Sequence, residues 1–201
     1  FLADRLEGGL QRDARQLLGG DAVLVSDHAL PSEVTQWVQA SGLQSAVTLT
    51  FPTMVRAGDG PDANSRLVAL KVVAPGYPLR GVLQILPPLD TPLPVAALSE
   101  NLTNQTPYDR PGVPTKTLPK PGEVWVEPAL LEALEIKPGM RISLGERTLT
   151  VSEVLVSEPD RGAGFMTFAP RVLMNQDDLA STGLVQPASR INWRLAVVGS
   201  A

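Results

Sequence analysis

The hydrophobic positions at the start of the chain follow the period of an α-helix. Leu2, Leu6 and Leu10 recur on successive turns, with arginines at other positions around them. An apolar residue on each turn forms a stripe along one side of a helix, so the sequence predicts a helix over residues 2–18. No Ser, Thr, Asp or Asn caps its start, which is typical of a helix that continues an earlier segment. With a strand predicted almost to the last residue, the pattern indicates a piece excised from a longer protein, or a secreted protein whose signal peptide has been removed.

The next part of the chain predicts a βαββ unit. Apolar and β-branched residues cluster between turn residues in three segments, which predicts strands at residues 21–27, 45–57 and 66–73. A helix is predicted between the first two strands. Its residues Val34, Trp37 and Val38 are expected to face the core, because residues three and four apart lie on one side of a helix.

Residues 87–121 are rich in proline. Proline prevents a long helix here and removes hydrogen-bond donors from any central strand. A loop of this length is usually functional or mobile, although a surface insertion without a role is an equal interpretation. If the loop is functional, it presents a partner or substrate surface whose candidate contacts are Pro107, Tyr108, Arg110 and Pro111. Trp125 is a further candidate for that surface, but its large indole favours a core position.

Regular structure is predicted again after residue 121. A strand leads into a short helix that begins at Pro128, since proline is tolerated in the first helical turn. Ile142 and Leu144 are then expected to face Leu149 and Val151 across a hairpin. This succession of short elements indicates a small barrel or an α+β fold.

The last part of the chain predicts a capped helix and a strand. Asn175 is a good helix cap, and Gly183 is expected to end that helix. In the final strand Ile191, Trp193 and Leu195 share one face. Every residue of this segment has a structural task, and none stands out as catalytic.

Composition excludes several classes of function. The chain has 201 residues, a formal net charge of −4, no cysteine and one histidine. It therefore has no disulfide, no thiolate metal site and no cluster of histidine ligands. The acidic balance argues against nucleic acid as a partner, because phosphates require a basic surface. No apolar run is long enough to span a bilayer.

The candidate reactive groups do not assemble into a recognisable catalytic motif. Ser26, Asp27 and His28 include the three residue types of a hydrolase triad, but adjacent strand residues point in alternating directions. The chain has neither a G-x-S-x-G elbow nor a P-loop. Asp160 and Arg161 lie in "EPDRGAGF", which we interpret as a turn. The sequence thus predicts no catalytic, cofactor-binding or metal-binding residue.

Motifs spread over most of the chain carry a resemblance to a known family. The chain resembles the first periplasmic domain of the FtsX/MacB-like ABC transporter permeases, in the YbbP-like branch that is encoded beside a periplasmic lysophospholipase/thioesterase. The motifs are "ADRLEGGLQRDARQLLGGDAVLVSD", "YPLRG", "GEVWVEPALLEAL", "EPDRGAGFMTFAPRVLMN" and "DLASTGLVQPASRINWRL". The resemblance implies an α+β fold with a MacB-like periplasmic core. In it, a porter-like βαβ lobe with the stalk helix comes from residues 1–66 and 160–201, and residues 67–159 form an inserted β-rich lobe.

The same resemblance implies a non-enzymatic role in the periplasm, in a bacterial inner-membrane protein. Membrane helices absent from this chain would flank it, and a separate cytoplasmic ATPase subunit would bind ATP. The stalk helix, with Leu2, Leu6 and Leu10, would transmit ATP-driven motion to the periplasm, for export or extraction of hydrophobic or lipid-like substrates with the hydrolase as partner. The alternatives are a free-standing periplasmic binding or adaptor protein, a soluble periplasmic enzyme such as an esterase, and a small-barrel domain of a larger enzyme.

Overall fold

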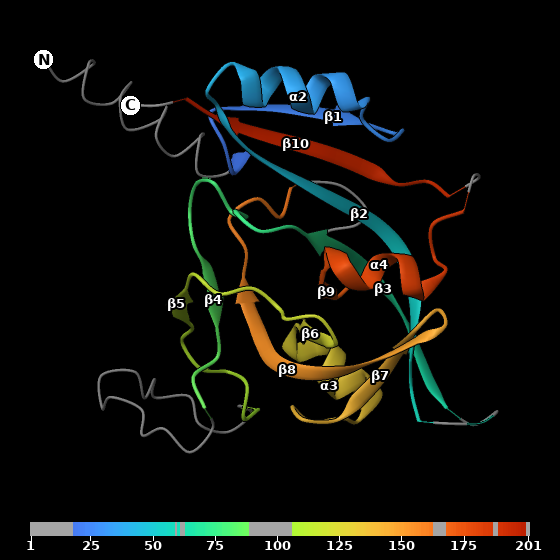
Figure 1. Ribbon diagram of the computed structural model, residues 1–201. Coiled ribbons are helices and arrows are strands. Elements are labelled where there is room, and N and C mark those ends of the chain that lie inside the picture. Colours follow the sequence, from blue (N-terminus) through green and yellow to red (C-terminus); the bar gives the residue numbers. More distant parts are fainter. Residues whose placement is uncertain are drawn as a thin grey trace, which may run out of the picture.

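A computed structural model describes residues 18–58, 60, 63–88, 106–162, 168–186 and 189–199. The helices in these residues are α2 (Ser32–Ala40), α3 (Pro128–Leu134) and α4 (Gln176–Thr182). The strands are β1 (Ala22–Ser26), β2 (Gln44–Ala57), β3 (Asn64–Val73), β4 (Leu83–Ile85), β5 (Val113–Thr115), β6 (Glu123–Val126), β7 (Arg141–Leu144), β8 (Arg147–Ser157), β9 (Arg171–Asn175) and β10 (Asn192–Val198). The fold is a sheet-rich α+β arrangement (Figure 1), which confirms the predicted class.

The strands form a sheet of order β1-β10-β2-β3-β9-β6-β8-β4-β5, with β7 pairing to both β2 and β8. Because β7 links β8 back to β2, the strands β2, β3, β9, β6, β8 and β7 close into a hydrogen-bonded ring. Closure of this kind gives every ring strand a paired neighbour on each of its two edges. β10 and β1 extend the sheet beyond β2, and β4 and β5 extend it beyond β8.

Alternate side chains of the ring strands form the main hydrophobic core. Val124 and Val126 of β6 belong to it, and Leu130, Leu131 and Leu134 of α3 add to it. The side chains in between face a second cluster, so strand β6 is buried on both faces.

Trp125 points into that second cluster with Leu83, Leu155 and Leu173, and it is 2% exposed. Its candidacy for the partner surface is therefore wrong, and the core position is confirmed. The indole lies on the face of β6 opposite to the ring core, because successive side chains of a strand alternate.

The predicted βαββ unit is confirmed as β1, α2, β2 and β3. β1 and β2 are both antiparallel to β10, which lies between them. The predicted division into lobes at residues 66 and 67 falls inside β3, and the ring combines strands from both predicted lobes. That division stays a prediction.

Helix α2 corrects one detail of the sequence prediction. Val38 is buried and Val34 is half-buried, but Trp37 is 67% exposed. The helix contacts β2 through a narrow face. Adjacent residues are about 100° apart around a helix, so this face accommodates Val38 and turns Trp37 toward solvent.

The predicted hairpin and helix cap are both confirmed. Ile142 pairs with Leu149 across β7 and β8, and the side chain of Asn175 accepts a hydrogen bond from the Asp177 amide at the start of α4. Gly183 ends that helix in the left-handed conformation, with φ of 64°. None of the helices in the described ranges is long and apolar enough to cross a membrane.

The hairpin turn meets the end of α4 at a point that only glycine fits. Gly145 has φ of 57°, and a Cβ there would lie 2.0 Å from the carbonyl oxygen of Thr182. The next amide, of Glu146, donates to the same oxygen at 2.9 Å. The close approach holds α4 against the β7–β8 hairpin.

Replacing this glycine is expected to be costly. Gly145→Ala should lower the free energy of unfolding in urea by about 3 kcal/mol, because backbone strain is added to a steric clash. Gly42→Ala is the matched control, since Gly42 has φ of 70° but no atom within 4 Å of an added Cβ. The control should lose only about 1 kcal/mol through the backbone. Equal losses in the two variants would contradict the close contact.

Candidate functional site

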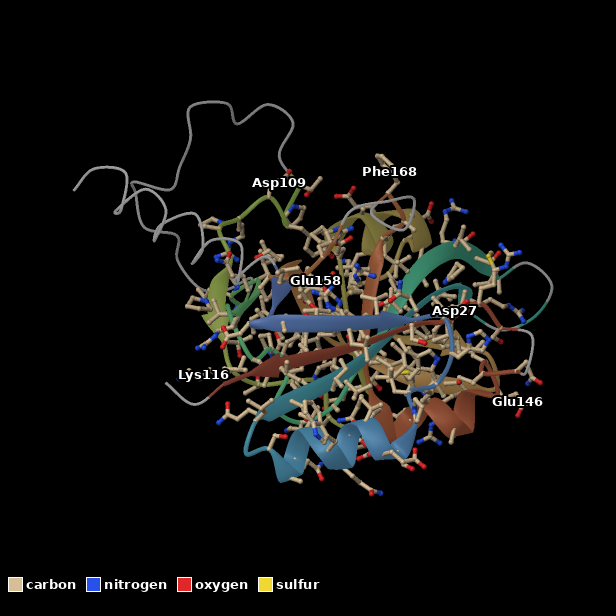
Figure 2. The ribbon with its side chains drawn as sticks, turned by 90° about the horizontal axis from the view of Figure 1, so that it is seen from above. Asp27, Asp109, Lys116, Glu146, Glu158 and Phe168 are labelled. Atoms are coloured by element: carbon tan, nitrogen blue, oxygen red, sulfur yellow. The ribbon has the colours of Figure 1, made fainter. Side chains whose placement is uncertain are left out.

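Five buried polar side chains meet at the ends of three ring strands. Lys71 lies on β3, Arg171 opens the parallel neighbour β9, Glu158 and Asp160 follow β8, and Tyr77 follows β3. Each side chain belongs to a residue that is at most 7% exposed. We call these five residues the charge cluster. Figure 2 shows its member Glu158 well inside the outline of the molecule.

Lys71 is the centre of the charge cluster. Its Nζ donates to the Tyr77 hydroxyl at 2.8 Å, and to Glu158 Oε2 and Asp160 Oδ1 at 2.9 and 2.7 Å. Three partners satisfy all three donors of an ammonium group. Tyr77 in turn donates to Asp160 Oδ1 at 2.5 Å, and the ammonium lies 4.6 Å from the centre of the Tyr77 ring. The buried cation is thus compensated in charge and in hydrogen bonding.

Arg171 connects the charge cluster to the start of α3. Its Nε donates to Glu158 Oε1 at 2.5 Å, and its backbone amide donates to Glu127 Oε2 at 2.9 Å. Glu127 is the residue that precedes α3, and it also accepts from the guanidinium of Arg161. These contacts bind the segment after β8 to the beginning of β9 and of α3.

Arg194 connects the charge cluster to the N-terminal side of the fold. Its Nε lies 3.7 Å from Asp160 Oδ2, and its terminal nitrogen donates to the Leu18 carbonyl oxygen. Gly19 packs directly on Asp160, since a Cβ at Gly19 would lie 3.0 Å from the Asp160 Cβ. The first described residues of the chain therefore contact the charge cluster through both a guanidinium and a backbone surface.

Burial and charge act in opposite directions on Asp160. Burial alone would raise its pKa, but the Lys71 charge and the hydrogen bonds from Lys71 and Tyr77 outweigh it, so the pKa lies below its ordinary value of 3.8. A lowered carboxyl pKa stabilises the fold above the unfolded-state pKa, and this stabilisation is lost as the pH falls through the folded-state pKa. For Tyr77, burial and then the charges of Asp160 and Glu158 raise the pKa well above 10.0. Both groups therefore keep the protonation states that the hydrogen bonds require at neutral pH.

This arrangement is suited to holding segments in one geometry. Removing one partner of a buried ion pair is strongly destabilising, because the remaining charge is left without compensation in a poorly solvated place. The charge cluster joins the segments around residues 18–19, 71–77, 158–161, 171 and 194. We regard it as the candidate functional site, in the sense of a rigid joint.

The other polar residues singled out in the sequence lie apart from it. Asp27 and His28 are exposed, and the His28 ring is 2.5 Å from Asp27 Oδ1. Hydrogen bonding to His28 and its charge lower the pKa of Asp27. Ser26 Oγ accepts a hydrogen bond from the backbone amide of His28, not from its imidazole ring. These contacts are local to the end of a strand.

The predicted partner surface is partly packed against the fold. Pro107 and Pro111 are exposed, whereas Tyr108 and Arg110 are half-buried. Tyr108 packs against the main core, and burial followed by the charge of Glu132 raises its pKa. The role of this surface stays a prediction. The stalk residues Leu2, Leu6 and Leu10 lie outside the described residues.

Sequence reasoning missed the charge cluster. The sequence predicts a strand at residues 66–73, which contains Lys71, without a role for this lysine, and it predicts a turn at Asp160 and Arg161. That interpretation is incomplete, because Asp160 is buried against Lys71 and Arg161 pairs with Glu127. The available signal was a lysine within the otherwise apolar run of residues 67–73, since a charged residue in that position needs a buried partner.

Comparisons with known proteins indicate which class of protein this chain is related to. No family model matches the chain. It is 33% identical over 199 residues to YbbP of Escherichia coli (strain K12), named as an uncharacterized ABC transporter permease; the match covers 99% of this chain. The chain is related to a segment of an ABC transporter permease. The resemblance to the YbbP-like branch is thereby confirmed. The chain corresponds to 21% of that permease's length.

A solved structure named as a domain of a permease protein from Porphyromonas gingivalis is also similar to this permease-related chain. It has 11% sequence identity and a TM-score of 0.43, and the match covers 83% of this chain and 67% of the other.

Removing the central cation should destabilise this permease-related domain strongly. In Lys71→Met, Glu158 and Asp160 lose their shared partner, and the free energy of unfolding at pH 7 should fall by about 3 kcal/mol or more in urea titration. Arg147→Met is the control, because Arg147 is exposed and 3.7 Å from Asp178, and the buried Asp178 carboxylate keeps its 2.7 Å hydrogen bond from the Gly122 amide in this variant. That variant should lose about 1 kcal/mol or less. A loss in Lys71→Met no larger than in the control would show that the charge cluster does not stabilise the fold.

Proposed function

We propose that this chain is the periplasmic domain of an inner-membrane ABC transporter permease, and that it transmits ATP-driven motion from stalk helices into the periplasm. A cytoplasmic ABC ATPase subunit would supply the motion. The domain itself would act without catalysis or a bound cofactor. The observation that carries this proposal is the contact of Arg194 with both the Leu18 carbonyl and Asp160, because it fixes the incoming chain to the buried charges of the ring.

The first and the last described segments of the chain are hydrogen-bonded to each other, which supports their attachment at one place. The Asp21 amide donates to the Val197 carbonyl at 2.8 Å, and the Gly199 amide donates to Asp21 Oδ2 at 3.2 Å. Arg80 holds Asp21 through two hydrogen bonds of 3.1 Å. A displacement applied at this point would pass into β1 and β10 and, through Asp160, into the ring. A rigid joint is what such transmission requires, because packed elements move as bodies and deform little internally.

The finer features belong to the same proposal. We infer a MacB-like core with a porter-like lobe and an inserted β-rich lobe, and transport of hydrophobic or lipid-like molecules by export or extraction. A periplasmic lysophospholipase/thioesterase would be the partner that receives or supplies them. Pro107 and Pro111, both exposed, would belong to the surface that meets this partner.

The test uses the full-length permease with its ATPase in lipid nanodiscs. Because this segment has no cysteine, Lys116→Cys offers a single exposed site for a spin label in it, once cysteines elsewhere are removed. The proposed transporter would contain two copies of the permease, and we expect the distance distribution between the labels on these copies to change from ADP to ATP with vanadate. Asp160→Asn should reduce the change while ATP hydrolysis continues, because the joint is loosened. Glu146→Gln, which removes an exposed carboxylate elsewhere, should leave the change intact.

Two results would contradict the proposal. One is an identical distance distribution in both nucleotide states, which would show that the domain does not move. The other is failure of a membrane-impermeant maleimide to label Lys116→Cys in intact cells when it labels the lysed cells, which would show that the domain is not in the periplasm. An undiminished change in Asp160→Asn would assign the coupling to another part of the domain.

A further inference from the structure

A cavity lies on β8, away from the charge cluster. It has a volume of about 530 Å³ and is lined by residues 86–88, 137–138 and 152–154. This volume is within the range of small-molecule sites, which is about 300–1,000 Å³. Most of the lining is apolar, and it comes from Leu86, Val154 and three prolines.

The cavity forms because two strands pair with the same edge of β8 and leave a gap between them. Before the gap, the Val151 amide donates to the Met140 carbonyl at 2.9 Å; after it, the Leu86 amide donates to the Val154 carbonyl at 2.8 Å. Pro87 and Pro138 flank the gap and have no amide hydrogen to extend either ladder. Because these two prolines lack an amide hydrogen, neither ladder of hydrogen bonds can extend into the gap and close it.

A β-bulge lies in the lining of the cavity. Val124 pairs with Val151, and the next pair is Trp125 with Glu153, so Ser152 is the extra residue of β8. The Ser152 Oγ is buried and has no hydrogen-bond partner. Bulges redirect side chains and are frequent beside functional sites. Rotation about the Cα–Cβ bond of this lining residue to another staggered rotamer would turn the unused hydroxyl toward a ligand in the cavity.

Glu153 gives the cavity its charge preference. It lies on the cavity lining, and burial, followed by the negative charge of Glu123, raises its pKa. Lys137 at the rim is exposed and makes no ion pair with Glu153, both residues being in the described part of the chain. A ligand cation would relieve the repulsion between the two carboxylates.

We propose that this cavity binds an amphipathic ammonium compound, whose apolar chain contacts Leu86, Val154 and the prolines and whose ammonium group is held by Glu153 and Ser152. The apolar walls select a hydrocarbon chain, and the carboxylate and hydroxyl fix one polar end. This inference is independent of the proposed transport role, since it concerns binding to the domain itself.

The test is an NMR titration of the isotope-labelled 201-residue chain at pH 7 with n-octylammonium, n-octanol and octanoate. Octylammonium should give saturable shifts at amides 153, 154 and 86, with octanol binding about tenfold more weakly, because it lacks the charge-assisted hydrogen bond. Glu153→Gln should weaken octylammonium binding about tenfold and leave octanol binding unchanged. Ser152→Ala should weaken it about fivefold without loss of stability, because the hydroxyl has no partner in the fold.

Glu146→Gln is the matched control, since it removes one exposed carboxylate from the β7–β8 turn, outside the cavity lining, and should leave binding unchanged. The proposal is overturned if octanol or octanoate binds as tightly as octylammonium, if Glu153→Gln and Ser152→Ala bind like the unaltered chain, or if the shifts are spread over the surface and spare residues 152–154.

Discussion

The burial of the Lys71 ammonium group is the constraint on which the rest of the structure depends. An unpaired cation cannot be kept inside a protein, because its desolvation costs far more than packing can recover. Glu158 and Asp160, which follow β8 in the sequence, must therefore lie beside the Lys71 ammonium group. The ring of strands is what brings them there, since β8 and β3 are separated in the ring by β6 and β9.

The same charge compensation fixes the N-terminal segment of the described chain relative to the ring. Asp160 has Lys71 on one side and Arg194 with Gly19 on the other. A carboxylate shared in this way joins the ring to the segment through which the chain arrives. The second core cluster adds to this, because Tyr77 belongs to it and also donates to Asp160. Hydrophobic packing and charge compensation thus fix the same joint.

Local pattern was sufficient for most elements of the fold. The period of two in β7 and β8 predicted their hairpin, and the side chain of Asn175 predicted a helix start that the structure confirms. The pattern failed where two apolar residues compete for one narrow face, as Trp37 and Val38 do. It could not indicate the closure of the ring, because β7 pairs with β2 across a large separation in sequence.

The functional features were harder to predict for the same physical reason. Lys71 and Asp160 are 89 residues apart in sequence, and nothing near either one specifies the other. The cavity depends on Ser152 being an extra residue in one strand, and on two other strands that stop short of each other. By contrast, the relation to a permease could be recognised from the sequence, because it rests on whole sequence motifs and does not depend on any individual contact.

Hydrogen exchange at individual amides tests the joint most directly. The exchange rates of residues 18–21 and of the β3 and β9 amides would be compared in the unaltered chain and in Asp160→Asn under native conditions. We expect faster exchange at residues 18–21 in the variant, with protection retained in β3 and β9, because the ring persists when its link to the N-terminal segment is weakened. Unchanged exchange at residues 18–21 would contradict the role of Asp160 in the joint, since that segment would then be held without the buried charges.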